Sequence, residues 1–101
     1  MPLVSIITAT FNSEHEIFDT YSSIKNQTMQ DWEWIVTDDA STDQTVHILQ
    51  KLSMNDDRIK INCNKVNLGA AASRNVSINN SQGEFLAFID SDDEEEDAEP
   101  V

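Results

Sequence analysis

Three short runs of mostly apolar residues and one further strand-like segment, separated by longer amphipathic stretches, constrain most strongly what this chain can fold into. The runs cover residues 3–8, 32–37 and 85–89, and the strand-like segment covers residues 58–62. The first run, LVSIIT, is rich in β-branched side chains. Near-continuous apolar runs of this length are typical of strands in a parallel sheet that is buried on both faces. The pattern therefore predicts four strands joined by three crossover connections.

The stretches between these runs have the apolar spacing of helices. Residues 17–24 carry apolar side chains at helical intervals, and Ser13 precedes them as a candidate N-cap. Residues 41–44, STDQ, have the form of a capping box before a second helix, and residues 70–80 predict a third. Strict alternation of strand and helix predicts a Rossmann-like, three-layer α/β/α fold with a parallel sheet.

The acidic charge of the chain is concentrated at one end. The formal net charge is −13, but residues 1–89 contain eleven acidic and six basic side chains and so carry only −5. A body with so few basic residues lacks the electrostatic footprint of a nucleic-acid-binding protein. We therefore expect one domain over residues 1–93 and an acidic, disordered tail over residues 94–101.

Cysteine usage and hydropathy bear on the location of the protein. Cys63 is the only cysteine, which excludes an internal disulfide and favours a reducing, intracellular setting. No basic leader precedes the first apolar run, and no run approaches the ~18 apolar residues of a membrane span. We expect a cytoplasmic protein, with the inner face of the membrane as a variant of that location.

Three loops follow strands at their carboxyl ends, at residues 9–13, 38–41 and 90–93. In a parallel sheet these ends share one edge, which is where open α/β sheets bind ligands. Residues 38 and 39 are both Asp, and Asp90, Asp92 and Asp93 follow the last strand. Carboxylates this close together would repel one another unless they share a cation, so the spacing predicts a divalent-metal site.

Several other nucleotide and metal sites are disfavoured. Glycine occurs only at positions 69 and 83, so neither a G-x-G-x-x-G fingerprint nor a Walker A loop is possible. Asp90 and Asp92 form a D-x-D that also occurs in phosphatases of the haloacid dehalogenase type. In those proteins the motif opens the fold and is followed by Thr or Val where this chain has Asp93, so this interpretation remains a minor alternative.

Four segments together resemble a known family. PLVSIITATFN, SSIKNQTMQDWEWIVTDDASTDQT, NLGAAASRN and GEFLAFIDSDD are similar to successive signatures of family 2 glycosyltransferases with the GT-A fold, and the resemblance spans residues 2–93. It implies the N-terminal, nucleotide-sugar-binding half of such an enzyme. It also implies a D-x-D motif that holds Mn²⁺ or Mg²⁺ against the diphosphate of the donor, most often a UDP-sugar.

The resemblance implies specific donor-site residues. Phe11 would lie against the nucleobase, Asp39 would accept a hydrogen bond from it, and Arg74 would lie near the donor. The full set of implied substrate-binding positions is Ala9, Phe11, Asp39, Arg74 and Asp90. Each has a structural alternative: a core aromatic at a strand end for Phe11, a turn or cap residue for Asp39, and a surface helix cation for Arg74. The turn or cap role fits Asp38, Ser41 and Asp43 better than Asp39.

The implied metal ligands are the acids after the last strand. Asp90 would contact the ribose or the metal, Asp92 would bind the metal that bridges the diphosphate oxygens, and Asp93 would assist or shape the loop. A metal there would neutralise the charge that develops on the departing nucleoside diphosphate.

The chain departs from the family pattern after Asp93, where it reads EEEDAEPV. Family members usually continue into an acceptor-binding half that carries the catalytic base, and no candidate base remains here, so the catalytic residues are unknown. We expect a donor site without a saccharide or lipid-linked acceptor site. The alternative is a non-catalytic remnant or interaction module, and an incomplete sheet would leave an edge through which the chain could form homo-oligomers.

Overall fold

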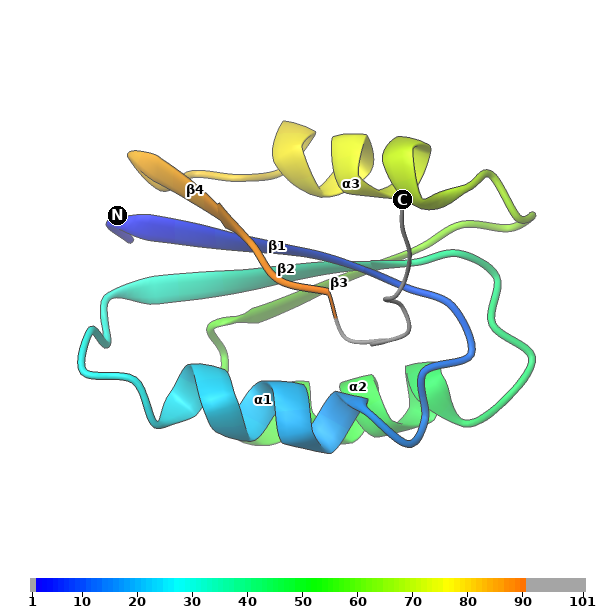
Figure 1. Ribbon diagram of the computed structural model, residues 1–101, viewed down its shortest axis with the longest axis horizontal. Helices are drawn as coiled ribbons and strands as arrows, with labels where there is room; N and C mark the ends of the chain where they lie inside the picture. The colour runs from blue at the N-terminus through cyan, green and yellow to red at the C-terminus, as the bar shows by residue number, and fades with distance from the viewer. Residues whose placement is uncertain (1, 91–101) are drawn as a thin grey trace, which may run out of the picture.

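The computed structural model describes residues 2–90, which form four strands and three helices in alternation (Figure 1). The elements in chain order are β1 (Val4–Thr10), α1 (Ile17–Lys25), β2 (Trp32–Asp38), α2 (Thr45–Asn55), β3 (Ile59–Cys63), α3 (Ala70–Asn79) and β4 (Phe85–Phe88). Asp92, Asp93 and the predicted tail over residues 94–101 lie outside the described residues.

The strands form one sheet in the order β3-β2-β1-β4, and each neighbouring pair is parallel. Figure 1 shows α1 and α2 on one face of this sheet and α3 on the other. The predicted α/β/α architecture with a parallel sheet is confirmed. Among residues 2–90, no helix combines the length and the apolar character that crossing a membrane requires.

The main core lies between the sheet and the α1–α2 layer. β2 is buried along its whole length. Its Trp34 is fully buried and stacks against Tyr21 of α1, with ring centroids 6.1 Å apart. The indole Nε1 of Trp34 donates to Thr8 Oγ1 at 2.9 Å, so burial of this polar atom is compensated. The central pair of strands thereby anchors α1.

The opposite face is covered by α3, which presents small side chains to the sheet. Ser73 and Ser77 are fully buried, and Ser77 Oγ lies 2.7 Å from Thr37 Oγ1 of β2. Small residues let the helix approach the sheet closely, and the hydroxyl pair removes the cost of burying two unpaired polar groups. α3 is therefore held at a defined position over β1 and β2.

A buried carboxylate fixes the connection that leads from α3 into β4. Glu33 is 5% exposed and accepts hydrogen bonds from Ser5 Oγ at 2.6 Å and from the Gln82 N–H at 2.7 Å. The Gly83 N–H donates to Ser5 Oγ at 2.8 Å, and a Cβ at Gly83 would lie 2.7 Å from the Ser5 nitrogen. Only glycine allows this approach, which places β4 beside β1.

β4 is an outer strand of the described sheet and is apolar on both faces. It pairs with β1 on one side, and Phe85, Leu86 and Phe88 are 59%, 44% and 56% exposed. An edge of this kind offers unpaired backbone groups and apolar surface to another strand. The expected open edge is thus present in residues 2–90.

Two predicted helix caps are wrong. Ser13 does not cap α1 with its side chain, which contacts the backbone of Phe11 instead, and α1 begins four residues later. In the predicted capping box, Ser41 Oγ donates to Asp38, not to the start of α2. Asp43 accepts the Thr45 N–H at 2.9 Å. Short-range contacts within each loop have thus replaced the caps that the sequence pattern favoured.

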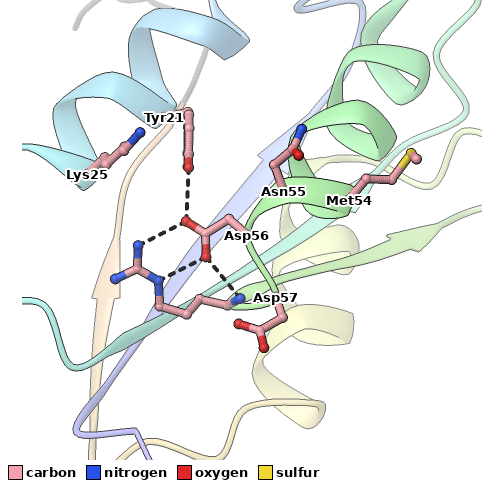
Figure 2. Close-up of a pocket in the computed structure, with 7 residues that line it drawn as sticks. Tyr21, Lys25, Met54, Asn55, Asp56 and Asp57 are labelled. Atoms are coloured by element: carbon pink, nitrogen blue, oxygen red, sulfur yellow. Dashed lines mark hydrogen bonds and ion pairs between the residues drawn. The ribbon is translucent and has the colours of Figure 1, made fainter.

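A hollow of about 530 Å³ lies at the amino edge of the sheet, between the last turns of α1 and the segment that leads into β3. Asp56 organises it: Figure 2 shows this carboxylate receiving the Tyr21 hydroxyl, at 2.9 Å. The Arg58 Nε and Nη2 atoms also donate to Asp56, each at 2.9 Å. The Arg58 guanidinium holds the pKa of Asp56 at about 2 against the opposing effect of burial. These groups satisfy one another, so we interpret the hollow as structural.

We expect Asp56→Asn to lower the free energy of unfolding by about 1–3 kcal/mol at pH 7, because it removes a buried, charge-assisted network. The folded pKa lies below the unfolded value of roughly 4, so the contribution is complete above that pH and is lost as the pH falls towards 2. Urea unfolding at pH 7 and pH 2.5 checks this, with exposed Asp57→Asn as the control. Equal losses from both variants, or a loss that persists at pH 2.5, would contradict the assignment.

Candidate functional site

The five residues implied as substrate-binding positions lie around one cavity at the carboxyl edge of the sheet. This cavity has a volume of about 80 Å³ and is lined by Ala9, Thr10, Phe11, Asp39, Ala70, Arg74 and Asp90. They come from the last two residues of β1, the loops after β1 and β2, the first half of α3 and the segment after β4. The structure therefore brings together residues that are up to 81 positions apart in the sequence.

Phe11 is the aromatic side chain at the cavity. It leaves β1 one residue after the strand ends and is 46% exposed. The alternative of a core aromatic at the strand end is therefore wrong, because the ring does not belong to the buried cluster under α1 and α2. An aromatic ring exposed at a cavity can stack against a planar ligand.

The two consecutive acids after β2 have different partners. Asp38 Oδ1 accepts from Thr10 Oγ1 at 2.7 Å and from Ser41 Oγ at 2.6 Å, and Asp38 Oδ2 accepts the Ser41 N–H at 2.8 Å. Asp38 and Ser41 thus form the turn, as expected. Only the second acid, Asp39, lines the cavity.

Asp39 is held by the segment that leads into α3. Its Oδ1 accepts the Leu68 N–H at 2.7 Å and the Asn64 amide at 3.0 Å, while Oδ2 accepts the Gly69 N–H at 2.8 Å. The turn and cap alternative is therefore correct for Asp39 as well, although the turn is 28 or more residues away in the sequence. Among the contacts that residues 2–90 make, Oδ2 has one donor, and a carboxylate oxygen can accept two.

These hydrogen bonds keep the carboxylate ionised. Burial by itself would raise the pKa of Asp39, but donation from Leu68, Asn64 and Gly69 outweighs it and lowers the pKa below its ordinary value. At neutral pH Asp39 is therefore an acceptor only. A ligand N–H placed at the cavity would find a fixed, charged acceptor with remaining capacity.

Arg74 and Asp90 form an ion pair across the cavity mouth. Arg74 Nη2 donates to both Asp90 carboxylate oxygens, at 3.1 and 3.3 Å, and the two side chains are 35% and 52% exposed. Arg74 thus agrees with its alternative as a surface helix cation, and it also lines the cavity. An exposed pair contributes at most about 1 kcal/mol, so a ligand can replace either partner at little cost.

Of the three predicted metal ligands, only Asp90 lies among the described residues. Asp90 lies two residues after the end of β4 and offers oxygen ligands of the kind that Mn²⁺ and Mg²⁺ prefer, so it fits such an ion. Asp92 and Asp93 lie outside the described residues. Within residues 2–90 no group of three His, Cys, Asp or Glu side chains is close enough to hold a metal.

Sequence reasoning missed the residues that support the site. Asn64 donates both to Asp39 and to Ser73 Oγ, at 3.0 and 2.9 Å, and Thr10 and Ala70 line the cavity. The one available signal was Gly69, which directly precedes α3 and has a φ of 98° that favours glycine. A glycine before a helix indicates a helix start, where backbone N–H groups need an acceptor. The sequence pattern does not say which side chain is that acceptor.

Comparison with known proteins identifies the family. A family model described as "Glycosyl transferase family 2" matches residues 5–99. The chain belongs to this family. The resemblance found in the sequence is thereby confirmed, and residues 5–99 include each implied donor-site and metal-binding position.

Curated relatives and solved structures agree with this assignment. A protein named for teichuronic acid biosynthesis glycosyltransferase activity in Bacillus subtilis is 45% identical over 92 residues, which cover 91% of this chain and 36% of the relative. A UDP-Glc:alpha-D-GlcNAc-diphosphoundecaprenol beta-1,3-glucosyltransferase of Escherichia coli is 44% identical over 91 residues, or 90% and 35% of the two chains. The chain thus spans about a third of the length of these relatives.

The fold is shared with a glycosyltransferase solved with its nucleotide sugar. The crystal structure of a 1–349 fragment of S. aureus TarS in complex with UDP-GlcNAc matches with a TM-score of 0.83 and 36% identity. The match covers 89% of this chain and 26% of that chain. The family's GT-A fold is therefore confirmed for this domain.

We expect Asp39→Asn to expose the turn before α3, because an amide cannot accept the Leu68 and Gly69 N–H groups with a full negative charge. Amide hydrogen exchange at these two residues should accelerate by about tenfold or more, as expected for the loss of about 1–3 kcal/mol. Asp19→Asn, an exposed acid on α1, serves as the control and should leave both rates unchanged. Unchanged exchange in Asp39→Asn would show that the carboxylate does not hold this turn.

Proposed function

We propose that this chain is the nucleotide-sugar-binding part of a family 2 glycosyltransferase that uses a UDP-sugar. The observation that carries the proposal is the convergence of Phe11, Asp39, Arg74 and Asp90 on one cavity at the carboxyl edge of a parallel sheet. This edge is the usual ligand site of open α/β sheets, and the four side chains match the chemistry of a base, a ribose and a diphosphate.

The nucleobase part of the proposal rests on Phe11 and Asp39. The exposed ring of Phe11 offers a stacking surface, and ionised Asp39 offers only an acceptor. Uracil carries a donor N–H at N3, where cytosine carries an acceptor. An ionised carboxylate therefore favours uracil and disfavours cytosine, which supports UDP over CDP.

The diphosphate part of the proposal rests on cations, because residues 1–89 carry a net charge of −5 and would repel a free diphosphate. Arg74 is the cationic side chain among the cavity's lining residues. Asp90, Asp92 and Asp93 would hold Mn²⁺ or Mg²⁺. When bound, this ion would neutralise the charge on the departing nucleoside diphosphate.

The acceptor and the location are proposed from the relatives alone. The Escherichia coli relative is named for transfer to a diphosphoundecaprenol-linked sugar. We propose a saccharide or lipid-linked acceptor for the complete enzyme, in cell-envelope polysaccharide synthesis at the cytoplasmic face of the membrane. A non-catalytic nucleotide-binding module is the second candidate, because the chain spans only about a third of the length of these transferases.

The decisive experiment is calorimetric titration of the purified chain with UDP, CDP and GDP, with and without Mn²⁺. We expect metal-dependent binding of UDP and weaker binding of CDP, because Asp39 rejects a base without a donor at N3. Asp92→Asn should remove most of the Mn²⁺ dependence, whereas the matched tail variant Asp97→Asn should not. A folded sample without metal-dependent binding, or equal effects of the two variants, would refute the site assignment.

A donor-release assay with UDP-sugars and simple sugar or lipid-phosphate acceptors tests whether this chain transfers sugar by itself. We expect no acceptor-dependent release, because the expected donor site has no acceptor site beside it. Robust acceptor-dependent release by the purified chain would contradict this expectation.

We also propose that the exposed β4 edge allows homo-oligomers. Sedimentation velocity across a concentration series should show self-association, and Leu86→Lys should reduce it by placing a charge on the apolar edge. Lys51→Glu, at an exposed position of α2, controls for a change of charge elsewhere on the surface. A monomer at all concentrations would exclude this mode of association.

A further inference from the structure

The loops that carry Phe11 and Asp39 are bonded directly to each other. The Asn12 N–H donates to Ser41 Oγ at 2.8 Å, and Asn12 Oδ1 accepts the Thr42 N–H at 2.9 Å. Asn12 is therefore linked to the opposite loop through both its backbone and its side chain. Further links between the two loops join Ser13 to Thr45 and Glu14 to Gln44, at 2.8 and 3.0 Å.

Both loops bend next to their cavity residue. Asn12, which follows Phe11, has a φ of 49°, and Ala40, which follows Asp39, has a φ of 62°. Non-glycine residues seldom adopt this left-handed conformation, although Asn tolerates it better than most. Such conformations persist only where surrounding contacts enforce them, and the hydrogen bonds between the loops supply those contacts.

The position of Asn12 separates it from the core. Its side chain is exposed, and it is not among the residues that line the cavity. Its two hydrogen bonds therefore act on the relative placement of the loops and contribute little to the packing of the sheet. The backbone N–H of Asp39 donates to the Thr10 carbonyl at 2.9 Å, which joins the two loops where they leave the sheet. The loop after β1 continues beyond this bond through Phe11, and the hydrogen bonds of Asn12 attach it to the other loop at a second point.

We infer that Asn12 is a positioning residue for nucleobase binding, which holds Phe11 at the distance from Asp39 that a pyrimidine ring requires. The inference rests on the proposed function, because it concerns the same cavity. A base gains from stacking on Phe11 and bonding Asp39 at the same time only if the two groups are placed before it arrives. Asn12 supplies that preorganisation without touching the ligand.

The test is UDP binding by Asn12→Gly, in the presence of Mn²⁺. Glycine tolerates the left-handed backbone but removes the acceptor of the Thr42 N–H. We expect UDP to bind about fivefold to tenfold more weakly, as for the loss of one hydrogen bond in a preorganised site. Asn12→Asp keeps both the acceptor and the backbone tolerance and should restore most of the affinity. Asn80→Ala removes another exposed Asn that bonds a backbone carbonyl, at 2.8 Å, and should leave binding unchanged.

A double-mutant cycle with Phe11→Ala distinguishes positioning from general stability. If Asn12 acts through Phe11, Asn12→Gly should cost little further affinity once the ring is absent, so the two effects will not add. Additive losses, or no loss in Asn12→Gly, would overturn the inference. If Asn12→Gly does not fold, Ser41→Ala carries the same expectation, because it removes the acceptor of the Asn12 N–H. Absence of UDP binding by the unchanged protein would instead refute the proposed function.

Discussion

The parallel pairing of β1 with β2 is the constraint on which the rest of the structure depends. Seven residue pairs are in register, from Val4 opposite Trp32 to Thr10 opposite Asp38, so both strands end at the same level. The two loops that follow therefore leave the sheet side by side. A shift of one residue would exchange the faces of every side chain and would turn Asp38 instead of Asp39 towards the cavity. Register thus decides which of two adjacent acids can meet a ligand.

Asp39 joins the candidate site to the scaffold. It accepts two backbone N–H groups from the turn before α3, so the same carboxylate positions α3 and faces the cavity. The first half of α3 in turn supplies Arg74. A group that both holds a helix and lines the cavity is costly to change, because its replacement loosens the helix that carries Arg74, another lining residue. This coupling explains why an acid at the cavity is only 4% exposed.

The two edges of the sheet differ in how completely their charges are paired. At the amino edge Asp56 is enclosed by Arg58 and Tyr21, and no acceptor capacity is directed outward. At the carboxyl edge the Arg74–Asp90 pair is half open to solvent, and the ring of Phe11 is unpacked. The first arrangement rigidifies the fold. The second leaves charges and a planar surface available for exchange with a ligand, which favours the smaller cavity as the functional one.

The amino-acid sequence by itself determined the order of strands and helices, because period and length of apolar runs are local properties. It also determined that the loops at residues 9–13, 38–41 and 90–93 would share one edge, since parallel strands align their carboxyl ends. The place of Arg74 beside them was implied only by the family resemblance. The tertiary structure alone decided which partners these side chains have. Ser13 and Ser41 carry good capping signals, yet neither side chain caps a helix. Ser13 Oγ bonds to the backbone of Phe11, while Ser41 Oγ donates to Asp38 and accepts the Asn12 N–H from the other loop. Asn64, which supports Asp39, has no sequence signal at all, because nothing in a one-dimensional pattern records which distant amide will reach a buried carboxylate.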